Sequence, residues 1–219
     1  MSEAPSLSPT SLPIVERVVR SIAESAIANE AHFSALDSVV GDGDFGFSLA
    51  RGFEKVLADF DGLDRSSVGT FLKKVALIIT SRCGGTSGPI WGTAFLRAGA
   101  AAGERQVLDE NGVVAVLRAA FAGIEQRGGA ALGDKTLLDA LGPFIDCLER
   151  ELAEKRGWLA ALERAASAAD SAARATTELV ARRGRASYTG ERSRGSIDPG
   201  AAAVALIAKN LCTALAPVR

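Results

Sequence analysis

Residues 14–27 read Ile-Val-Glu-Arg-Val-Val-Arg-Ser-Ile-Ala-Glu-Ser-Ala-Ile, and their spacing of apolar residues recurs along most of the chain. Val15, Val19, Ile22 and Ala26 follow the i, i+4, i+7 spacing that places apolar side chains on one face of an α-helix. The pattern therefore predicts an all-α fold of about eight antiparallel helices joined by short loops. The other segments with this spacing are 49–60, 68–80, 90–102, 113–124, 136–152, 158–180 and 199–215.

Several residues at the expected helix starts support this reading. Ser67, Asp134 and Asp198 are residue types that cap helices, because their side-chain oxygens accept hydrogen bonds from free backbone N–H groups. Pro199 follows Asp198 and suits the first helical position. No segment of four to eight residues alternates convincingly as a β-strand.

The composition is that of a folded globular protein. The chain has 219 residues, of which 47% are hydrophobic and 23% charged, and this argues against a disordered chain. Lys and Arg number 25 against 26 Asp and Glu. This near-neutral balance argues against a nucleic-acid partner, since such binders are usually basic. The apolar stretches are shorter than the roughly 18 residues of a membrane span, so no membrane partner is expected.

The expected organisation is a flexible lead-in over residues 1–13 followed by one domain over residues 14–219. The lead-in is rich in Ser and Pro and lacks the basic and apolar regions of a secretory signal. Cys83, Cys147 and Cys212 lie far apart without metal-binding spacing. We therefore expect a reducing compartment, thiols buried in the core and a cytoplasmic protein.

Three carboxylates, those of Asp37, Asp42 and Asp44, lie within eight residues of one another. Residues 41–46 match the GxGxxG pattern, but the two carboxylates inside it would repel a pyrophosphate, so we reject a Rossmann loop. An EF-hand also fails, because the position that needs a bidentate Glu is Phe53.

Two interpretations of this acidic loop stay open. One is a solvated turn held by side-chain-to-backbone hydrogen bonds. The other is a divalent-cation site, in which glycines let the chain fold tightly around hard oxygen ligands. Mg²⁺ typically takes one or two carboxylates plus water and substrate phosphates, so three carboxylates could hold two ions.

Two glycine-rich loops could meet phosphates or a nucleotide. Residues 84–89 read Gly-Gly-Thr-Ser-Gly-Pro before a predicted helix, where backbone amides and two hydroxyls can approach an anion. An ordinary capped turn is the alternative. Residues 128–136 nearly spell a P-loop, but Asp134 stands where Lys is needed and no strand precedes it. We reject that motif, while Lys135 and Thr136 could still meet a nucleotide.

The longest irregular stretch, residues 184–200, lies in an arginine-rich part of the chain. An RNA-binding arm is a weak reading, because Tyr188 is the one aromatic residue there and the net charge is near zero. A solvated loop and a lid whose guanidinium groups bind phosphates both stay open. The arginines are Arg182, Arg183, Arg185, Arg192 and Arg194. Together the loops would assemble a phosphoryl-transfer site.

At this point the chain resembles the L subunit, or L domain, of dihydroxyacetone kinases, from about residue 29 to residue 203. The matching motifs, in chain order, are Leu36-Asp37, Gly41-Asp-Gly-Asp44, Gly84-Gly-Thr-Ser-Gly-Pro89, Gly133-Asp-Lys-Thr136, Gly184-Arg-Ala-Ser-Tyr188, Gly190-Glu-Arg-Ser193 and Asp198-Pro-Gly-Ala201.

The resemblance implies a barrel of eight antiparallel α-helices with a nucleotide at one end. It implies that Asp37, Asp42 and Asp44 hold two Mg²⁺ ions on the phosphates of ADP or ATP. It further implies that Arg185 supports the phosphates as the catalytic residue. The expected nucleotide contacts are Phe45, Gly46, Phe47, Ser48, Thr86, Ser87, Gly128, Leu137, Arg185, Asp198, Pro199 and Gly200, with Thr136 added from its loop.

The resemblance also implies a partner, a separate K subunit that binds the ketose. Two regimes stay open: ATP exchanges as a substrate, or ADP stays bound and is rephosphorylated by a phosphotransferase-system protein. A free-standing L chain favours resident ADP. A homodimer stays open as well.

The chain departs from the family pattern at two positions. Phe45 and Ser196 stand where the family usually has histidines. These departures suggest a divergent branch acting on another short ketose, such as a tetrulose. Two rival functions are a nucleotide-sensing regulatory module without turnover and the nucleotide domain of a fatty acid kinase. The arginine-rich motifs favour the ketose kinases over the latter.

Overall fold

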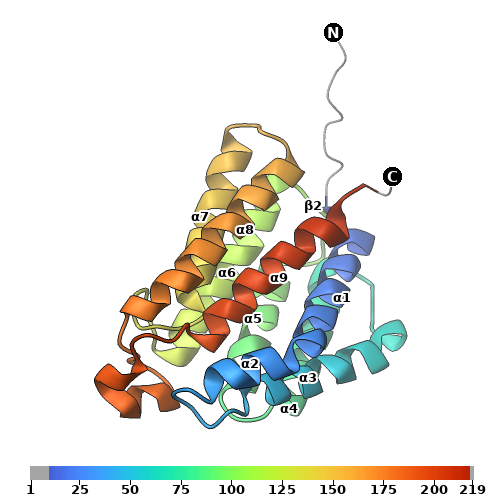
Figure 1. The fold of residues 1–219 in the computed structure, drawn as a ribbon. Helices are drawn as coiled ribbons and strands as arrows, with labels where there is room; N and C mark the ends of the chain where they lie inside the picture. Colours follow the sequence, from blue (N-terminus) through green and yellow to red (C-terminus); the bar gives the residue numbers. More distant parts are fainter. Residues whose placement is uncertain (1–9, 218–219) are drawn as a thin grey trace.

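A computed structural model describes residues 10–217, and the chain is predominantly helical over that range (Figure 1). The all-α prediction is confirmed. The described part of the chain contains α1 (Leu12–Ala28), α2 (Glu30–Asp37), α3 (Phe45–Ala58), α4 (Val68–Arg82), α5 (Ser87–Ala102), α6 (Glu110–Gly128), α7 (Leu138–Ala153), α8 (Trp158–Ala175) and α9 (Pro199–Leu215). Short 3₁₀ segments are η1 (Phe60–Gly62), η2 (Thr176–Glu178) and η3 (Arg185–Ser193).

Eight of these helices form a closed ring. Each long helix packs on the next in chain order, α1 packs directly on α3, and α9 returns to pack on α1. The short helix α2 lies outside this ring, against α3 and α9. The sequence reading missed α2, because only Phe33 within it is buried and its eight residues show no extended apolar stripe.

The predicted helix starts are right at two of three positions. The side chain of Ser67 accepts a hydrogen bond from Thr70 N at 3.0 Å, and that of Asp198 accepts one from Ala201 N at 2.7 Å. Asp134 does not cap α7, which begins four residues later. Its carboxylate instead accepts hydrogen bonds from Ala131 N and from Arg183.

Part of the predicted lead-in is structured. Strand β1 (Thr10–Ser11) pairs antiparallel with β2 (Val107–Leu108), and α1 follows at once at Leu12. The prediction of a flexible segment is therefore wrong for residues 10–13, while residues 1–9 lie outside the described range. Two-residue strands are too short to leave an alternating pattern in the sequence.

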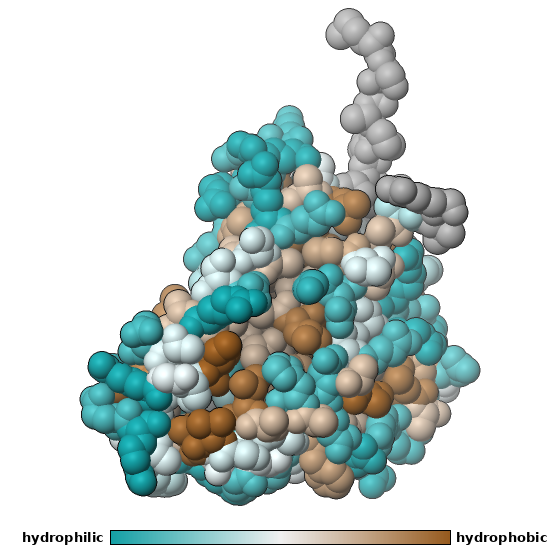
Figure 2. Space-filling model, in the orientation of Figure 1, coloured by the Kyte–Doolittle hydropathy of each residue, from teal (hydrophilic) through white to brown (hydrophobic). Residues whose placement is uncertain are grey.

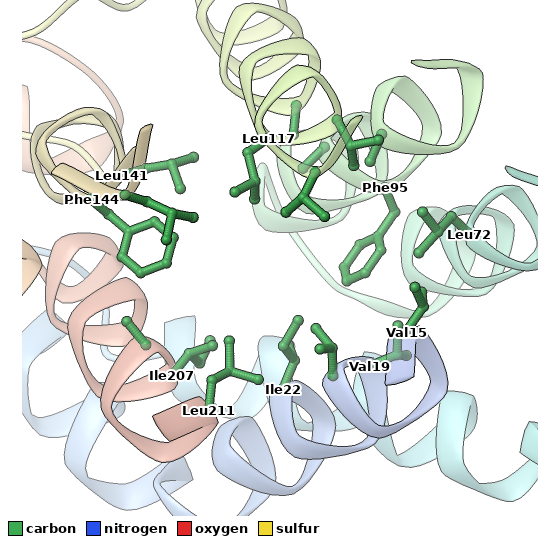
Figure 3. Close-up of a pocket in the computed structure, with 18 of the residues that line it drawn as sticks. Val15, Val19, Ile22, Leu72, Phe95, Leu117, Leu141, Phe144, Ile207 and Leu211 are labelled. Carbon is green, nitrogen blue, oxygen red and sulfur yellow. The ribbon is translucent and has the colours of Figure 1, made fainter. Parts of the chain in front are cut away.

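The inside of the ring contains an apolar cavity of about 250 Å³ (Figure 3). Val19, Leu72, Phe95, Phe144 and Ile207 point into it from five different helices. A void of this size with an apolar wall excludes ordered water and has room for an apolar guest. Smaller side chains close the packing elsewhere, notably the alanines along α8.

Two further expectations concern membrane-spanning helices and the cysteines. Among the described residues, no helix is both long enough and apolar enough to cross a membrane. All three cysteines are free; Cys83 and Cys147 are buried as expected, whereas Cys212 is only partly buried. Burial raises the pKa of Cys83 to about 11, so its thiol stays protonated and poorly reactive at neutral pH.

Gly46, at the start of α3, permits the close crossing of α2 and α3. A Cβ atom on Gly46 would overlap the carbonyl oxygen of Glu30 and would lie 2.7 Å from Ser34 N. Only a glycine fits there, because the obstructing atoms belong to the backbone of α2 and cannot rotate away. The crossing fixes the two helix ends that flank the acidic loop.

We expect Gly46→Ala to destabilise the fold by about 1–3 kcal/mol, because the added methyl group must push α2 away from α3. Chemical denaturation monitored by circular dichroism measures this change. Gly62→Ala is the matched control, since a Cβ atom there meets nothing within 4 Å. Equal stabilities of the two variants would show that the crossing does not need glycine.

Candidate functional site

The ring brings four connections to one end of the molecule. Because neighbouring helices run in opposite directions, every second connection falls at the same end. These connections are the acidic loop between α2 and α3, the loop between α4 and α5, the loop between α6 and α7, and the segment between α8 and α9. They coincide with the four loops that the sequence singled out for their polar chemistry.

Close approaches confirm that residues from different loops meet there. A Cβ atom on Gly84 would lie 3.0 Å from Ser48 Oγ, and one on Gly200 would lie 3.2 Å from Leu137 Cβ. A Cβ atom on Gly128 would lie 3.3 Å from the Ile90 side chain. The predicted contacts Gly200 and Leu137 therefore lie side by side, and Ser48 and Gly128 each lie against a residue of the loop between α4 and α5 or of the first turn of α5.

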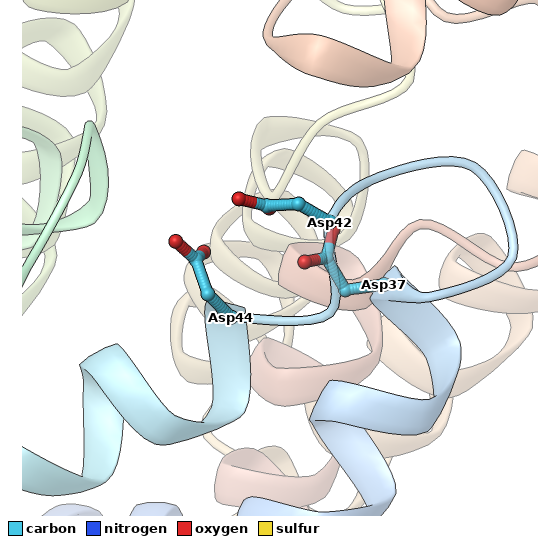
Figure 4. Close-up of side chains that lie close together, drawn as sticks. All are labelled: Asp37, Asp42 and Asp44. Carbon is cyan, nitrogen blue, oxygen red and sulfur yellow. The ribbon is translucent and has the colours of Figure 1, made fainter.

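The three aspartates of the acidic loop point toward one another (Figure 4). Asp37 ends α2, Asp42 lies in the loop and Asp44 directly precedes α3. One carboxylate oxygen from each lies within 4.8 Å of the others. Three negative charges this close repel one another unless a cation lies between them.

The backbone around the aspartates is shaped to keep them together. Phe45 N donates a hydrogen bond to Asp37 Oδ2 at 3.3 Å, which ties the end of α2 to the start of α3. A Cβ atom on Gly41 would overlap the Asp37 carboxylate, so only a glycine lets the loop turn back over it. Gly43 has φ +76°, a left-handed conformation that side chains disfavour.

These residues fit a magnesium site. The ligand atoms are hard carboxylate oxygens, and the side chains of Asp42 and Asp44 are 37% and 50% exposed. Partial exposure leaves room for water and for oxygens of a bound substrate, which Mg²⁺ retains in most protein sites. The geometry therefore favours the cation site over the solvated turn.

Residues 176–198, which we call the arch, connect α8 to α9 beside the acidic loop. The stretch 184–200 is not wholly irregular as predicted, because η3 lies within it, and the predicted helix over 158–180 ends at Ala175, where η2 follows. The Arg185 guanidinium pairs with Asp42 and approaches Asp44 at 4.0 Å. Figure 2 shows hydrophilic residues over the lower left of the molecule, where η3 lies. A cation contributed by the arch thus faces the aspartates.

The loop between α4 and α5 presents the start of a long helix. Thr86 is exposed and Ser87 is the first residue of α5, whose early N–H groups have no partner within the helix. Gly85 has φ +57°, and a Cβ atom on Gly88 would lie 2.5 Å from the Cys83 carbonyl oxygen. The turn is therefore tight, and it leaves a helix N-terminus open to an anion.

In the segment after the acidic loop, Phe45 to Ser48, some side chains pack toward the core and others lie at the surface. Phe45 is half-buried, with its ring 6.1 Å from that of the buried Phe33. Phe47 is 54% exposed with the Arg51 guanidinium over its ring, and Ser48 is buried beside Gly84. Packing against Phe33 gives Phe45, where the resemblance led us to expect a histidine, a structural role.

The motif Asp198-Pro-Gly-Ala201 begins α9 and lies against the residue that precedes α7. Asp198 caps α9, and its own N–H donates to Thr176 Oγ1 at 2.9 Å. Burial, together with a smaller contribution from the neighbouring Asp139, raises the pKa of Asp198 to about 7. The Ala201 N–H and Lys135 oppose this rise without cancelling it.

In the loop between α6 and α7, Lys135 does not have the role that we expected from the sequence. Lys135 is buried with its ammonium hydrogen-bonded to the arch, so it does not meet a nucleotide as proposed from sequence. Thr136 N donates to Asp139 Oδ2 at 2.7 Å, and this carboxylate also accepts a hydrogen bond from Gly133 N. Sequence reasoning missed Asp139, whose one signal was an acidic residue in the first turn of a helix.

Ser196, the second position at which the resemblance led us to expect a histidine, lies at the base of the arch. It is buried, its hydroxyl donates to Ser193 O at 3.1 Å, and its carbonyl accepts from Lys135. In the described structure this serine is a packing residue of the arch.

Comparison with known proteins agrees with this site. A family model described as "DAK2 domain" matches residues 39–213. The ADP-binding subunit DhaL of a PEP-dependent dihydroxyacetone kinase from Escherichia coli is 38% identical over 183 residues, 84% of this chain and 87% of that subunit. A D-erythrulose kinase from Mycolicibacterium smegmatis is 36% identical over 90% of this chain, which spans 34% of that kinase.

Solved structures show the same fold. The dihydroxyacetone kinase of C. freundii matches 97% of this chain with a TM-score of 0.72 and 28% sequence identity. The same kinase in complex with AMP-PNP and Mg²⁺ matches with a TM-score of 0.71. This chain spans 36% of the length of that kinase.

We expect Asp42→Asn to lower the affinity for Mn²⁺, used as a probe for Mg²⁺, by at least about tenfold, because it removes one of the anionic ligands. Electron paramagnetic resonance of free Mn²⁺ measures the loss. Asp61→Asn removes an acidic side chain outside the cluster and serves as the control. Unchanged Mn²⁺ affinity in Asp42→Asn would contradict the metal assignment.

We expect Asp198→Asn to flatten the pH dependence of stability. The raised pKa means that the folded protein keeps the Asp198 proton between about pH 4 and pH 7, where the unfolded chain releases it. The contribution to stability is therefore present below about pH 4 and is lost as pH rises through 7. Asparagine retains the cap without this loss.

Melting temperatures of both proteins at pH 5 and pH 8 test this expectation. Asp198→Asn should gain stability relative to the wild type on going to pH 8. Asp109→Asn, at the exposed cap of α6, is the control and should show no such gain. If the wild type loses no more stability than Asp198→Asn between pH 5 and pH 8, the pKa of Asp198 is not raised in the folded state.

Proposed function

The chain belongs to the DAK2 domain family, and we propose that it is the nucleotide-binding subunit of a ketose kinase. Its relatives are named as dihydroxyacetone and erythrulose kinases or as subunits of them, so the chain serves phosphoryl transfer. In this proposal it binds ADP or ATP with Mg²⁺. A separate K subunit binds the short ketose whose hydroxyl accepts the phosphoryl group.

One observation carries this proposal: three carboxylates and a guanidinium converge at the end of the ring where the glycine-rich loops meet. Phosphoryl transfer needs positioned phosphates, divalent cations and a cationic side chain for the developing charge. It does not need a nucleophile from this chain. The arrangement therefore fits a subunit that handles the nucleotide while a partner handles the sugar.

The proposed roles follow from the places of the residues. Asp37, Asp42 and Asp44 would hold two Mg²⁺ ions, which when bound neutralise the negative charge of the nucleotide phosphates. Arg185 would release Asp42 and pair with phosphate oxygens, where its planar fork adds direction to charge. Thr86 and Ser87, with the N–H groups of α5, would orient the phosphates.

The nucleoside would lie toward α6, α7 and α9. Gly128, Leu137 and Gly200 provide small or apolar surface on that side, and Pro199 begins α9 beside them. Thr136 flanks the same surface. The segment from Phe45 to Ser48 borders the phosphates, with Gly46 keeping α2 close. We propose all of these residues as nucleotide contacts.

We propose ADP as the resident nucleotide. The relatives that this chain covers over 87–90% of their length are named ADP-binding subunits of PEP- or PTS-dependent kinases. A phosphotransferase-system protein would then rephosphorylate ADP in place. The erythrulose kinases are about three times longer than the matched region. They therefore support the fold and the kinase chemistry of this chain, but they give less support to any choice of phosphoryl donor.

Several coarser features complete the proposal. One hydrophobic core joins residues from all nine helices, which supports a single nucleotide-binding domain over the described chain. We propose a cytoplasmic location, a tetrulose or dihydroxyacetone as the partner's substrate, and a homodimer as one possible assembly. We also propose that the chain belongs to a divergent branch of the ketose kinases. Phe45 packs against the core, so this position offers no imidazole that could bind a phosphate.

The first experiment identifies the nucleotide in the purified protein. We expect protein prepared without added nucleotide to release near-stoichiometric ADP on denaturation, as measured by chromatography and mass spectrometry. An empty protein that binds ATP tightly with Mg²⁺ would instead indicate an exchanging kinase. Failure to bind any nucleotide would contradict the proposed function.

A second readout separates a kinase from a sensor. Mixed with the cognate K subunit, a ketose and a phosphoryl donor, the protein should support ketose phosphorylation, and Asp42→Asn should abolish it. Nucleotide binding without turnover would favour a regulatory module. Turnover with a fatty-acid-binding partner in place of the K subunit would favour the fatty acid kinase alternative.

A further inference from the structure

The ammonium group of Lys135 is buried between the α6–α7 loop and the arch. The residue is 3% exposed. Its Nζ donates hydrogen bonds to the carbonyl oxygens of Thr176 at 2.8 Å, Leu179 at 3.3 Å and Ser196 at 2.6 Å. An ammonium group has three donors and no acceptor, so these carbonyls satisfy it completely.

The three carbonyls belong to opposite ends of the arch. Thr176 and Leu179 lie on its first foot, just after α8, and Ser196 lies on its second foot, just before α9. One side chain therefore joins two segments about twenty residues apart in sequence. Gly195 N also donates to Thr177 O at 2.9 Å, so the feet lie directly against each other.

The preceding residue, Asp134, holds the arch at a third point. Its carboxylate accepts a hydrogen bond from Arg183 Nε at 3.0 Å, and its backbone carbonyl accepts one from Arg182 N at 3.0 Å. Burial alone would raise the pKa of Asp134, but the Ala131 N–H and the Arg183 guanidinium hold it below the usual value. An ionised Asp134 thus fixes the chain two residues before Arg185.

Local backbone and helix geometry suit a cation at this place. Lys135 has φ +61°, a conformation uncommon for residues with side chains and retained where the surroundings enforce it. Thr176 is the C-cap of α8, and the end of a helix carries partial negative charge that favours a buried ammonium. The strained turn therefore aims the side chain at the foot of the arch.

We propose that Lys135, assisted by Asp134, is a positioning residue for Arg185: it clamps both feet of the arch and so holds the guanidinium over the aspartates. This inference rests on the proposed function, because it assigns the clamp a purpose in nucleotide binding. The Arg185 side chain is 61% exposed, and among residues 10–217 it forms ion pairs only with Asp42 and Asp44. Its direction depends on the backbone that carries it.

The test combines proteolysis with a double-mutant cycle. The variants are Lys135→Met, Arg185→Gln and both together, with Asp134→Asn as a second route to loosening the arch. Lys155→Met is the matched control, because Lys155 also has positive φ (+54°) but is exposed at the opposite end of the ring. Both lysine variants remove one trypsin site, which keeps the comparison fair.

The first readout is trypsin cleavage within the arch, which contains exposed arginines. We expect Lys135→Met to be cut there at least about tenfold faster than wild type or Lys155→Met, since cleavage follows local opening. Asp134→Asn should show the same change if Lys135→Met does not fold. Equal cleavage of folded variants and wild type would overturn the proposal.

The second readout is the affinity for Mg·ADP. We expect Lys135→Met and Arg185→Gln each to weaken binding about tenfold, and the double variant to bind no more weakly than Arg185→Gln. A residue that merely supports the fold would weaken binding in both backgrounds, so additive losses would overturn the proposal. A wild-type protein that binds no Mg·ADP would refute the proposed function, while trypsin cleavage would still decide whether Lys135 clamps the arch.

Discussion

The packing of α1 against α9 is the contact on which the rest of the structure depends. It joins the first helix to the last and closes the ring. Asn210 donates a hydrogen bond to Ser25 Oγ at 2.8 Å, and Arg17 donates to the Ala214 carbonyl across the same boundary. The acidic loop follows α1 and α2, whereas the arch precedes α9. This closure therefore sets the approach of Arg185 to the aspartates.

Ring closure also explains why chemistry gathers at one end. With eight antiparallel helices, alternate connections share an end, and the functional loops occupy that end. The opposite end contains the simple turns, the β1–β2 pair and Lys155. The scaffold needs only helical periodicity and small residues at crossings, such as Gly46, so the loops are free to carry polar residues that a core could not bury.

Much of the fold could be predicted from the sequence, because apolar periodicity reports directly on which face of a helix is buried. Ser67 and Asp198 were predicted as caps from residue type alone, and both cap. Asp134 has the same chemistry but a different role, since its choice of partner depends on where Arg183 lies in space. The helix predicted over 158–180 ends at Ala175, and this end also depends on a residue distant in sequence. The Thr176 hydroxyl donates a hydrogen bond to Ala173 O, and the Thr176 carbonyl accepts one from the buried Lys135.

The candidate site was predictable in composition but not in assembly. The three aspartates lie within eight residues of one another, so their convergence could be expected from the loop alone. Their contact with Arg185 joins residues more than 140 positions apart, and no local pattern encodes it. The replacements at Phe45 and Ser196 could be seen as departures from the family, but only the structure shows that one packs on Phe33 and the other bonds to Lys135.

The account depends most directly on the claim that carboxylates and nucleotide meet through a divalent cation. Calorimetric titration of the nucleotide-free protein with ADP, in Mg²⁺ and again in excess EDTA, measures this dependence. The account predicts tight binding with Mg²⁺ and a loss of at least about a hundredfold in affinity with EDTA. Equal affinity under both conditions would contradict it, because the nucleotide would then bind without the aspartates.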